Sequence, residues 1–200
     1  MARLTREQSQ ALTRERILQA AGDVVARDGY DGASVERIAE AAGYSKGAFY
    51  SNFSSKEDVL NHLLERHAGR DVIDLSEALE GLSEPDAIIE AVAAWSESRA
   101  SEMKWGLLAI ESLRRANRDG TLGEHQRQPF ITQWHDIGTL LLTKLFPDGA
   151  PEIDPVDLGG ILLNLTYGGI TVFLATSSTA QMVRQILVAF VDAYHPSRMA

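Results

Sequence analysis

Hydrophobic residues recur at helical spacing along nearly the whole chain. Between residues 35 and 42 they are Val35, Ile38, Ala39 and Ala42, which stand at i, i+3, i+4 and i+7 and so share one helix face. No segment holds a convincing alternation of apolar and polar positions, the pattern of a half-buried strand. We therefore predict an all-α fold of about nine helices, over residues 7–28, 35–42, 46–51, 56–79, 85–100, 102–117, 121–146, 155–176 and 179–194.

The segment 34–53 carries the sharpest helix-boundary signals. Ser34 and Ser45 each precede a short helix, where a side-chain oxygen caps the free N–H groups. Gly43 stands between the two helices, where a residue that adopts positive φ ends the first of them. Phe49 and Phe53 are four residues apart and therefore point together into a core. The spacing predicts two short helices joined by a tight turn.

The other side of the second short helix suits contact with DNA. A short helix with an aromatic back and a small, hydroxyl-rich, basic front is typical of a recognition helix in the major groove. Its glycine and alanine let the backbone approach base edges, and its lysine and tyrosine reach phosphates. The alternative, two ordinary amphipathic helices in an all-α core, does not explain why these residues occur together. The front is formed by Ser45, Lys46, Gly47, Ala48, Tyr50 and Ser51.

The stretch from Thr13 to Leu64, about a quarter of the chain, closely resembles the DNA-binding motif of the TetR family of transcriptional regulators. The resemblance depends on RERIL, the Gly29–Tyr30 connection, SVERIAEAAG, YSKGAFYSNF and SKEDVL in this order. It implies a three-helix helix-turn-helix DNA-binding domain at residues 1–54 and a helical ligand-binding and dimerisation domain at residues 55–200. The predicted DNA-binding residues are Thr13, Arg14, Ser34, Tyr44, Ser45, Lys46, Gly47, Ala48, Tyr50, Ser51 and Lys56.

The last two helices are predicted to form a symmetric four-helix interface with a second copy, as the resemblance implies. Glycine pairs at 159–160 and 168–169 are unfavourable inside a helix, so they indicate close backbone approach or room for a ligand. The alternative is a core within one chain and no dimer. The predicted interface residues are Leu158, Ile161, Leu162, Leu165, Gly169, Val172, Met182, Val183, Ile186, Leu187 and Phe190.

The middle helices are expected to surround a pocket for a small-molecule effector, which the resemblance implies. Three tryptophans favour a largely apolar or aromatic ligand with a few polar anchors, and Glu111 is the best single anchor. The alternative is that each tryptophan belongs to the core and that Glu111 is exposed. The predicted pocket residues are Trp95, Met103, Trp105, Leu108, Glu111, Phe130, Trp134, Asn164, Tyr167 and Phe173.

The charge and composition of the chain bear on DNA binding, on metal or cofactor sites and on localisation. The net charge of −9 lies mostly after residue 66, because residues 1–66 carry nine Lys and Arg against ten Asp and Glu. The chain has no cysteine, and His62 and His67 are five residues apart, so we predict no metal site and no cofactor. The N-terminus lacks the apolar run of a signal peptide, and the apolar stretch 161–175 is short for a membrane span. We expect a cytoplasmic protein.

These features together predict a ligand-responsive regulator that binds a palindromic operator as a homodimer, most simply as a repressor, and that is not an enzyme. An all-α enzyme or small-molecule carrier is the first alternative, but no catalytic constellation is visible. The second alternative is a DNA-binding activator or architectural protein without a ligand.

Overall fold

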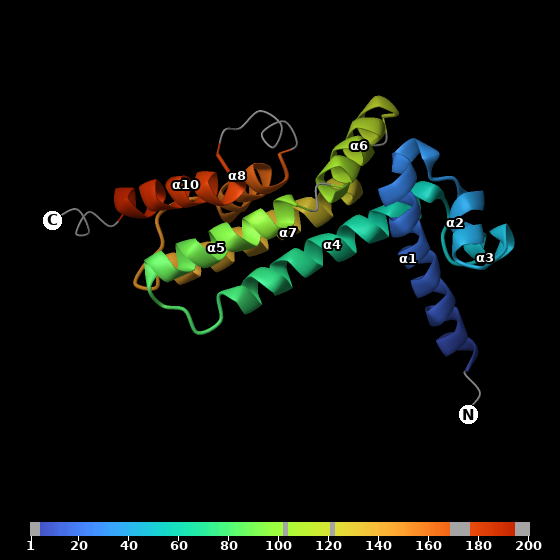
Figure 1. Cartoon of the computed structure of the whole chain (residues 1–200), viewed down its shortest axis with the longest axis horizontal. Helices are drawn as coiled ribbons and strands as arrows, with labels where there is room; N and C mark the ends of the chain where they lie inside the picture. The colour runs from blue at the N-terminus through green and yellow to red at the C-terminus, as the bar shows by residue number, and fades with distance from the viewer. Residues whose placement is uncertain (1–4, 102–103, 121–122, 169–176, 195–200) are drawn as a thin grey trace. The chain divides into compact units, whose positions relative to one another are not determined.

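The computed structural model describes residues 5–101, 104–120, 123–168 and 177–194. Within these ranges the chain forms nine helices and no strand, which confirms the all-α prediction (Figure 1). The helices are α1 (Arg6–Gly32), α2 (Val35–Ala41), α3 (Lys46–Tyr50), α4 (Lys56–Ala78), α5 (Pro85–Ala100), α6 (Lys104–Arg118), α7 (Glu124–Leu145), α8 (Pro155–Tyr167) and α10 (Thr179–Tyr194).

The chain divides into two compact units. The first unit holds Met1–Arg66 with Leu108–Leu122, and the second holds His67–Leu107 with Gly123–Ala200. The long helices α4 and α6 therefore each contribute residues to both units. The predicted domain division after residue 54 falls inside the first unit.

Side-chain caps set the helix boundaries of the first unit. The Ser34 hydroxyl accepts a hydrogen bond from the Arg37 N–H at 3.3 Å, and the Ser45 hydroxyl accepts one from the Ala48 N–H at 3.2 Å. These are the two caps that the sequence predicts, because a serine oxygen satisfies an N–H that has no partner within the helix. Gly29, with φ of 72°, interrupts α1 where the predicted helix ends.

The apolar faces of these helices form one core. Phe49 and Phe53 are 0% and 2% exposed, as their four-residue spacing predicts. The Tyr30 ring is also buried, and two cations contact it, Lys56 at 4.4 Å and Arg115 at 4.7 Å from its centroid. Burial and the nearby Glu57 carboxylate raise the pKa of Tyr30 to about 12, so the phenol is neutral at physiological pH. The core also includes Ile17, Leu18, Ala21, Val24, Ile38, Val59, Leu60 and Leu63.

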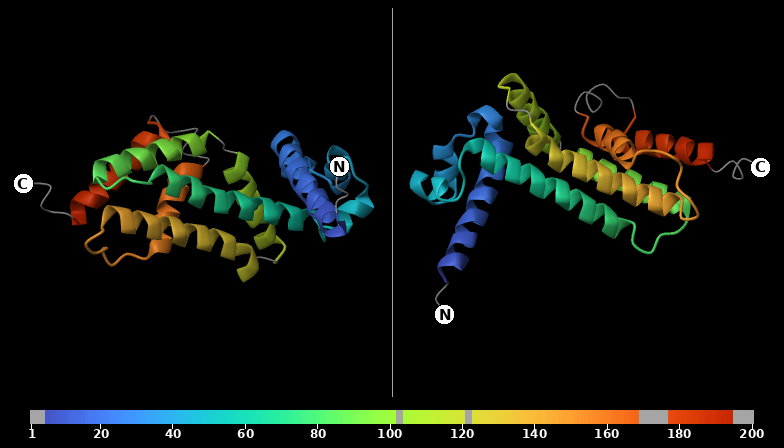
Figure 2. Two further views of the ribbon diagram at one scale, coloured as in Figure 1. Left: turned by 90° about the horizontal axis from the view of Figure 1, so that it is seen from below. Right: turned by 180° about the vertical axis from the view of Figure 1, so that it is seen from behind.

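In the second unit the backbones of α7 and α8 approach each other unusually closely at two glycines. Figure 2 shows the helices of this unit from two further sides. A Cβ atom on Gly138 would lie 1.8 Å from the Pro155 carbonyl oxygen, and one on Gly159 would lie 1.9 Å from the Trp134 carbonyl oxygen. Only hydrogen fits between these backbones. The close approach predicted from the first glycine pair is therefore confirmed. The core around it consists of buried side chains of α4, α5, α7, α8 and α10, including Leu75, Ile88, Val92, Ile137, Leu141, Leu162, Val183 and Leu187.

One helix boundary differs from the predictions, and two further details concern α7 and the start of α4. The helix α8 ends at Tyr167, because Gly168 has a non-helical ψ of 88°, although the sequence pattern extended the helix to residue 176. The helix α7 contains Pro129 in its interior. At the start of α4 the Ser55 hydroxyl accepts a hydrogen bond from the Asp58 N–H at 3.1 Å, and the Asp58 carboxylate accepts one from the Ser54 N–H at 2.7 Å.

No helix in the described ranges has the length and apolar character needed to cross a membrane.

Candidate functional site

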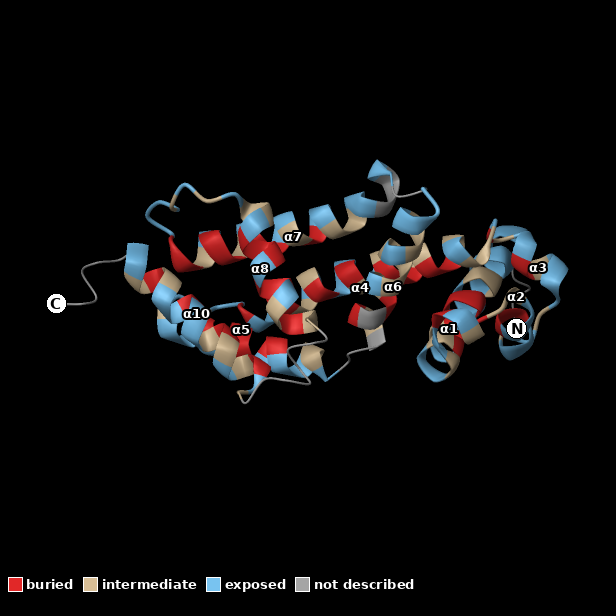
Figure 3. Ribbon diagram, turned by 90° about the horizontal axis from the view of Figure 1, so that it is seen from above, coloured by how far each residue is buried: buried red, intermediate tan, exposed pale blue. Residues whose placement is uncertain are grey.

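The front of α3 is exposed to solvent, and the back of the helix is anchored in the core of the first unit. Ser45, Lys46, Gly47, Tyr50 and Ser51 are exposed, whereas the aromatic back of the helix lies in the core (Figure 3). Of the other predicted DNA-binding residues, Thr13, Arg14, Ser34, Tyr44, Ala48 and Lys56 are half-buried.

Two side-chain hydrogen bonds also stabilise the backbone of α3. The Ser51 hydroxyl donates to the Gly47 carbonyl oxygen at 2.8 Å, and the Asn52 amide donates to the Ala48 carbonyl oxygen at 2.8 Å. A Cβ atom on Gly47 would meet nothing closer than the Ser45 Oγ, at 3.6 Å. Packing within the chain therefore does not require a glycine at position 47. An approaching surface, such as the edge of a base, would use the space that the missing side chain leaves.

Lys46 is the cation of this exposed face. Its ammonium forms an ion pair with the Glu36 carboxylate on α2, and their side chains are 54% and 59% exposed. The hydrogen bond with Glu36 raises the pKa of Lys46, and the same bond lowers the pKa of Glu36, so both groups are charged at neutral pH. An exposed pair of this kind is weak and exchanges readily with other ions.

Arg14 and Lys56, which were also predicted to contact phosphate, have interior partners. The Arg14 guanidinium donates to the Asn52 carbonyl oxygen at 2.6 Å and lies 4.2 Å from the centroid of the Phe53 ring. The Lys56 ammonium donates to the Tyr30 carbonyl oxygen at 3.0 Å. Both cations therefore stabilise the first unit, and phosphate contact by either one stays a prediction.

Arg16 is a cation that the predicted site omits. It is exposed on α1 near the Tyr44 phenol, which also accepts a 3.5 Å hydrogen bond from the Thr13 hydroxyl. Hydrogen bonds from Thr13 and Arg16 lower the pKa of Tyr44. The signal in the sequence was the i+3 spacing from Thr13, which places Thr13 and Arg16 on one face of α1. Because Arg16 is exposed and pairs with a phenol rather than with a backbone carbonyl oxygen, it is a better candidate for a phosphate contact than Arg14 or Lys56.

The predicted effector residues are divided between the two units. Leu108 and Glu111 belong to the first unit, where Glu111 forms an ion pair with Arg114 at 2.9 Å. Trp95, Trp105, Phe130, Trp134, Asn164 and Tyr167 belong to the second unit, while Met103 and Phe173 lie outside the described residues.

Trp95 and its neighbour Ser96 place polar atoms in the core of the second unit. Trp95 is 7% exposed and Ser96 is 0% exposed. Neither the Trp95 Nε1 nor the Ser96 Oγ has a hydrogen-bond partner among the described residues. Asn164 is exposed instead, and its amide donates to the Gly160 carbonyl oxygen at 2.8 Å. A buried polar atom without a partner is unfavourable, so Trp95 is the more plausible polar contact for a ligand.

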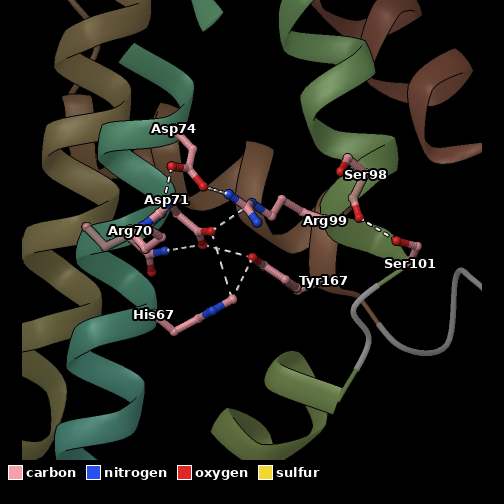
Figure 4. Close-up of polar contacts among 9 residues, drawn as sticks. His67, Arg70, Asp71, Asp74, Ser98, Arg99, Ser101 and Tyr167 are labelled. Atoms are coloured by element: carbon pink, nitrogen blue, oxygen red, sulfur yellow. Dashed lines mark hydrogen bonds and ion pairs between the residues drawn. The ribbon is translucent and has the colours of Figure 1, made fainter. Parts of the chain in front are cut away.

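A buried carboxylate lies on the part of α4 that belongs to the second unit (Figure 4). Asp71 is 0% exposed, and its Oδ2 accepts hydrogen bonds from the Tyr167 hydroxyl and the Gln133 amide, both at 2.8 Å. The Arg99 Nε lies 3.1 Å from its other oxygen. Burial raises the pKa of Asp71 to about 6, although the hydrogen bond from Tyr167 and the charge of Arg99 act in the opposite direction.

His67 extends this cluster. Its Nε2 is 3.0 Å from the Tyr167 hydroxyl oxygen, and its ring stacks on Trp105 with centroids 4.6 Å apart. Because Tyr167 donates its proton to Asp71, its oxygen accepts one from His67, which assigns the proton to Nε2. Sequence reasoning missed this cluster. The signal was Asp71 itself, a carboxylate within the apolar stripe of α4 between Leu64 and Leu75.

The residues predicted to form the dimer interface differ in how far they are exposed to solvent. Leu158, Leu162, Val183 and Leu187 are buried in the core of their own chain, which leaves no surface on them for a second copy. Ile161 and Ile186 are 53% and 50% exposed on α8 and α10. Leu165, Met182 and Phe190 are half-buried, and Gly169 and Val172 lie outside the described residues.

No group of three or more histidine and acidic side chains that could hold a metal ion occurs within the residues that the structure describes.

Comparison with known proteins agrees with the geometry of the first unit. Residues 17–63 match the family model described as bacterial regulatory proteins, tetR family. The chain is 23% identical over 157 residues to the HTH-type transcriptional regulator UidR of Escherichia coli K12, covering 78% of this chain and 79% of UidR. It is 24% identical over 183 residues to the HTH-type transcriptional repressor AcnR of Corynebacterium glutamicum, covering 88% of each. These relatives are regulators, which confirms the prediction that the chain is not an enzyme.

Solved structures share the whole fold. The regulator FadR from Bacillus subtilis, in complex with stearoyl-CoA, matches with a TM-score of 0.64 and 19% identity over 88% of this chain and 97% of that one. A transcriptional regulator from Saccharomonospora viridis, in complex with choline, matches with a TM-score of 0.63 and 21% identity over 92% and 97%. Both similarities show that the helical arrangement extends through the second unit.

Proposed function

Because this chain belongs to the tetR family of bacterial regulatory proteins, we propose that it is a ligand-responsive repressor that binds a palindromic operator as a homodimer. That it is a DNA-binding transcriptional regulator follows from the family. The repressor activity, the operator symmetry and the effector are the proposal. The similarity to AcnR, a repressor whose match covers 88% of this chain, supports repression rather than activation.

The observation that carries the proposal is the exposed front of α3. Its small residues sit on a helix fixed by Phe49 and Phe53 and by the Asn52 and Ser51 hydrogen bonds. A rigid helix with Gly47 and Ala48 at its front brings backbone and small side chains to base edges, while exposed cations bind phosphates. Base contact comes from Tyr44, Ser45, Gly47 and Ala48, and phosphate contact from Thr13, Arg16, Lys46 and Tyr50.

A second copy supplies the second recognition helix. Ile161 and Ile186 give α8 and α10 an exposed apolar surface, which a two-fold related copy would bury. Two recognition helices must lie about 34–36 Å apart to enter successive major grooves. We propose that Ile161 and Ile186 set this distance through the dimer.

The effector binds within the second unit and favours a dimer with a different spacing, so that DNA affinity falls by linkage. Couplings of this kind are typically about 1–3 kcal/mol. The complexes of neighbouring folds with choline and with stearoyl-CoA support a small-molecule site in this fold. The buried Trp95 and the aromatic pair of His67 and Trp105 favour a largely apolar or aromatic ligand. Since α4 contributes to both units, it transmits the change.

The test is a salt titration of binding to duplex DNA from the region upstream of the protein's own gene, compared with random-sequence duplex. The protein is first unfolded, dialysed and refolded to remove any bound ligand. We expect tight binding of one symmetric fragment with two subunits per site, and a log–log salt slope that reflects several phosphate contacts. Binding of one subunit per site would overturn the dimer proposal. If the refolded protein showed no preference for any fragment of the genome, the repressor proposal would fail.

A further inference from the structure

The ion pair between Glu36 and Lys46 joins the two short helices of the first unit. Glu36 lies in the first turn of α2, and Lys46 is the first residue of α3. The Glu36 carboxylate also accepts a hydrogen bond from the Ser34 hydroxyl, which helps to lower the pKa of Glu36. This carboxylate therefore binds Ser34 and Lys46, two of the side chains predicted to face DNA.

A carboxylate and a DNA phosphate offer the same chemistry to these donors. Each is an anionic group whose oxygens accept charge-assisted hydrogen bonds from an ammonium and ordinary ones from a hydroxyl. Pairing with Glu36 leaves the ammonium with free N–H donors but offsets its positive charge, and the neighbouring carboxylate repels a phosphate. Contact of Lys46 with DNA thus requires an exchange of one anion for another, and it leaves Glu36 facing the phosphate backbone without its counter-charge.

We propose that Glu36 is a specificity-determining residue, which takes the place of a DNA phosphate on Lys46 in the free protein and gives it up only on the operator. On random DNA no phosphate is held at the position that replaces the carboxylate, so the pair persists and Lys46 adds nothing to affinity. On the operator the base contacts of α3 fix a phosphate beside Lys46, and the exchange takes place. This inference rests on the proposed DNA-binding function.

The setting of Lys46 differs from that of Arg14 and Lys56, the other two cations predicted to contact DNA. Arg14 and Lys56 are held by the backbone carbonyl oxygens of Asn52 and Tyr30 and by aromatic rings, contacts that do not depend on a carboxylate. Lys46 is held by a carboxylate that is 59% exposed. Exposed ion pairs are screened by salt and are easily exchanged, so this is a contact that a phosphate can displace.

The chain offers a matched control on the same helix. Glu40 lies one turn after Glu36 on α2 and is also exposed, but its carboxylate has no ion-pair partner among the described residues. Glu36→Gln and Glu40→Gln therefore remove the same charge from the same helix, and only the first frees Lys46. The double variant Glu36→Gln/Lys46→Gln removes both members of the pair.

The experiment measures salt titrations of wild type and the three variants on two probes. One probe is a duplex recovered by selection with the wild-type protein, and the other is a pool of random duplexes, each of about 30 base pairs, or three turns. Circular dichroism melting checks that the exposed substitutions leave the fold intact. We expect Glu36→Gln to steepen the log–log salt slope on random DNA by about 0.9, the value of one added phosphate contact. Its slope on the selected duplex stays that of wild type, and its preference for that duplex falls several-fold.

Glu40→Gln should change the affinity for both probes by the same factor and leave the log–log salt slope unchanged. The double variant should restore the wild-type slope on random DNA. Equal slopes for Glu36→Gln and Glu40→Gln on random DNA would overturn the inference, because Glu36 would then act only as a negative charge. A steep slope that persists in the double variant would overturn it as well, because Lys46 would not be the cation released. If selection recovered no preferred duplex, the proposed function would fail, while the random-DNA slopes would still decide whether Glu36 restrains Lys46.

Discussion

Alanine at Gly159 should separate two helices that touch through their backbones. A Cβ atom there would lie 1.9 Å from the Trp134 carbonyl oxygen and 3.0 Å from the Gly138 nitrogen. These are backbone atoms inside α7, so no side-chain rotation relieves the clash. To restore a separation of about 3.4 Å, α7 and α8 must move apart by about 1.5 Å, which forfeits dispersion contacts along the whole helix pair.

The magnitude follows from two opposing terms. Overpacking a core costs about 1–3 kcal/mol, and a clash with a rigid backbone belongs at the upper end of that range. Replacing glycine by alanine inside a helix returns about 1 kcal/mol through backbone entropy. We therefore expect Gly159→Ala to lower the free energy of unfolding by about 2 kcal/mol, which lowers Tm by about 4–8 °C for a chain of this size.

Gly69→Ala is the control, since Gly69 is an exposed position on α4 where an added Cβ atom would have no other atom within 4 Å. It should raise the free energy of unfolding by about 0.5–1 kcal/mol. Both variants are compared with wild type by urea and thermal unfolding at one protein concentration, because a dimer's Tm depends on concentration. Equal stabilities of Gly159→Ala and Gly69→Ala would refute the close packing of α7 on α8.

Three other predictions concern the two units separately. Arg14→Ala should lower the free energy of unfolding by about 1–2 kcal/mol, because its guanidinium is half-buried against Asn52, whereas Arg16→Ala should change unfolding little and weaken DNA binding. Folding raises the pKa of Asp71 from 3.8 to about 6, so the neutral carboxyl stabilises the fold most below pH 4 and loses that contribution as pH rises to about 7. In urea unfolding, the free energy of unfolding of wild type should fall by about 3 kcal/mol relative to that of Asp71→Asn over this range. Parallel pH profiles of the two proteins would contradict the burial of the charge. Ile186→Asp should convert the dimer to a monomer in sedimentation without loss of helical circular dichroism, and an unchanged mass would exclude this face as the interface.

Local signals made the helices of this chain predictable. Ser34 and Ser45 cap the helices that follow them, and Gly29 interrupts α1 where the predicted helix ends, because each effect depends on residues within one turn. The burial of Phe49 behind an exposed polar front also follows from spacing alone. These signals place α3 and its exposed residues without knowledge of the tertiary fold.

Pairings between distant residues could not be predicted in the same way. Arg14 and Asn52 are 38 residues apart, and Asp71 and Tyr167 are 96 residues apart. No local pattern distinguishes a cation that stabilises the core from one that faces solvent, so Arg14 was predicted as a phosphate contact and Arg16 was not. The pairing of Lys46 with Glu36 depends likewise on the angle between α2 and α3, which spacing does not determine.

Selection from a random-sequence duplex pool, with the refolded protein and sequencing of the bound fraction, tests sequence-specific binding by α3 most directly. We predict enrichment of one inverted repeat whose half-sites lie about one helical turn apart, centre to centre. The same selection with Gly47→Ala, which the chain's own packing tolerates, should recover a weaker or altered half-site. A pool that remains unenriched after repeated rounds would contradict a regulator that reads DNA sequence through α3.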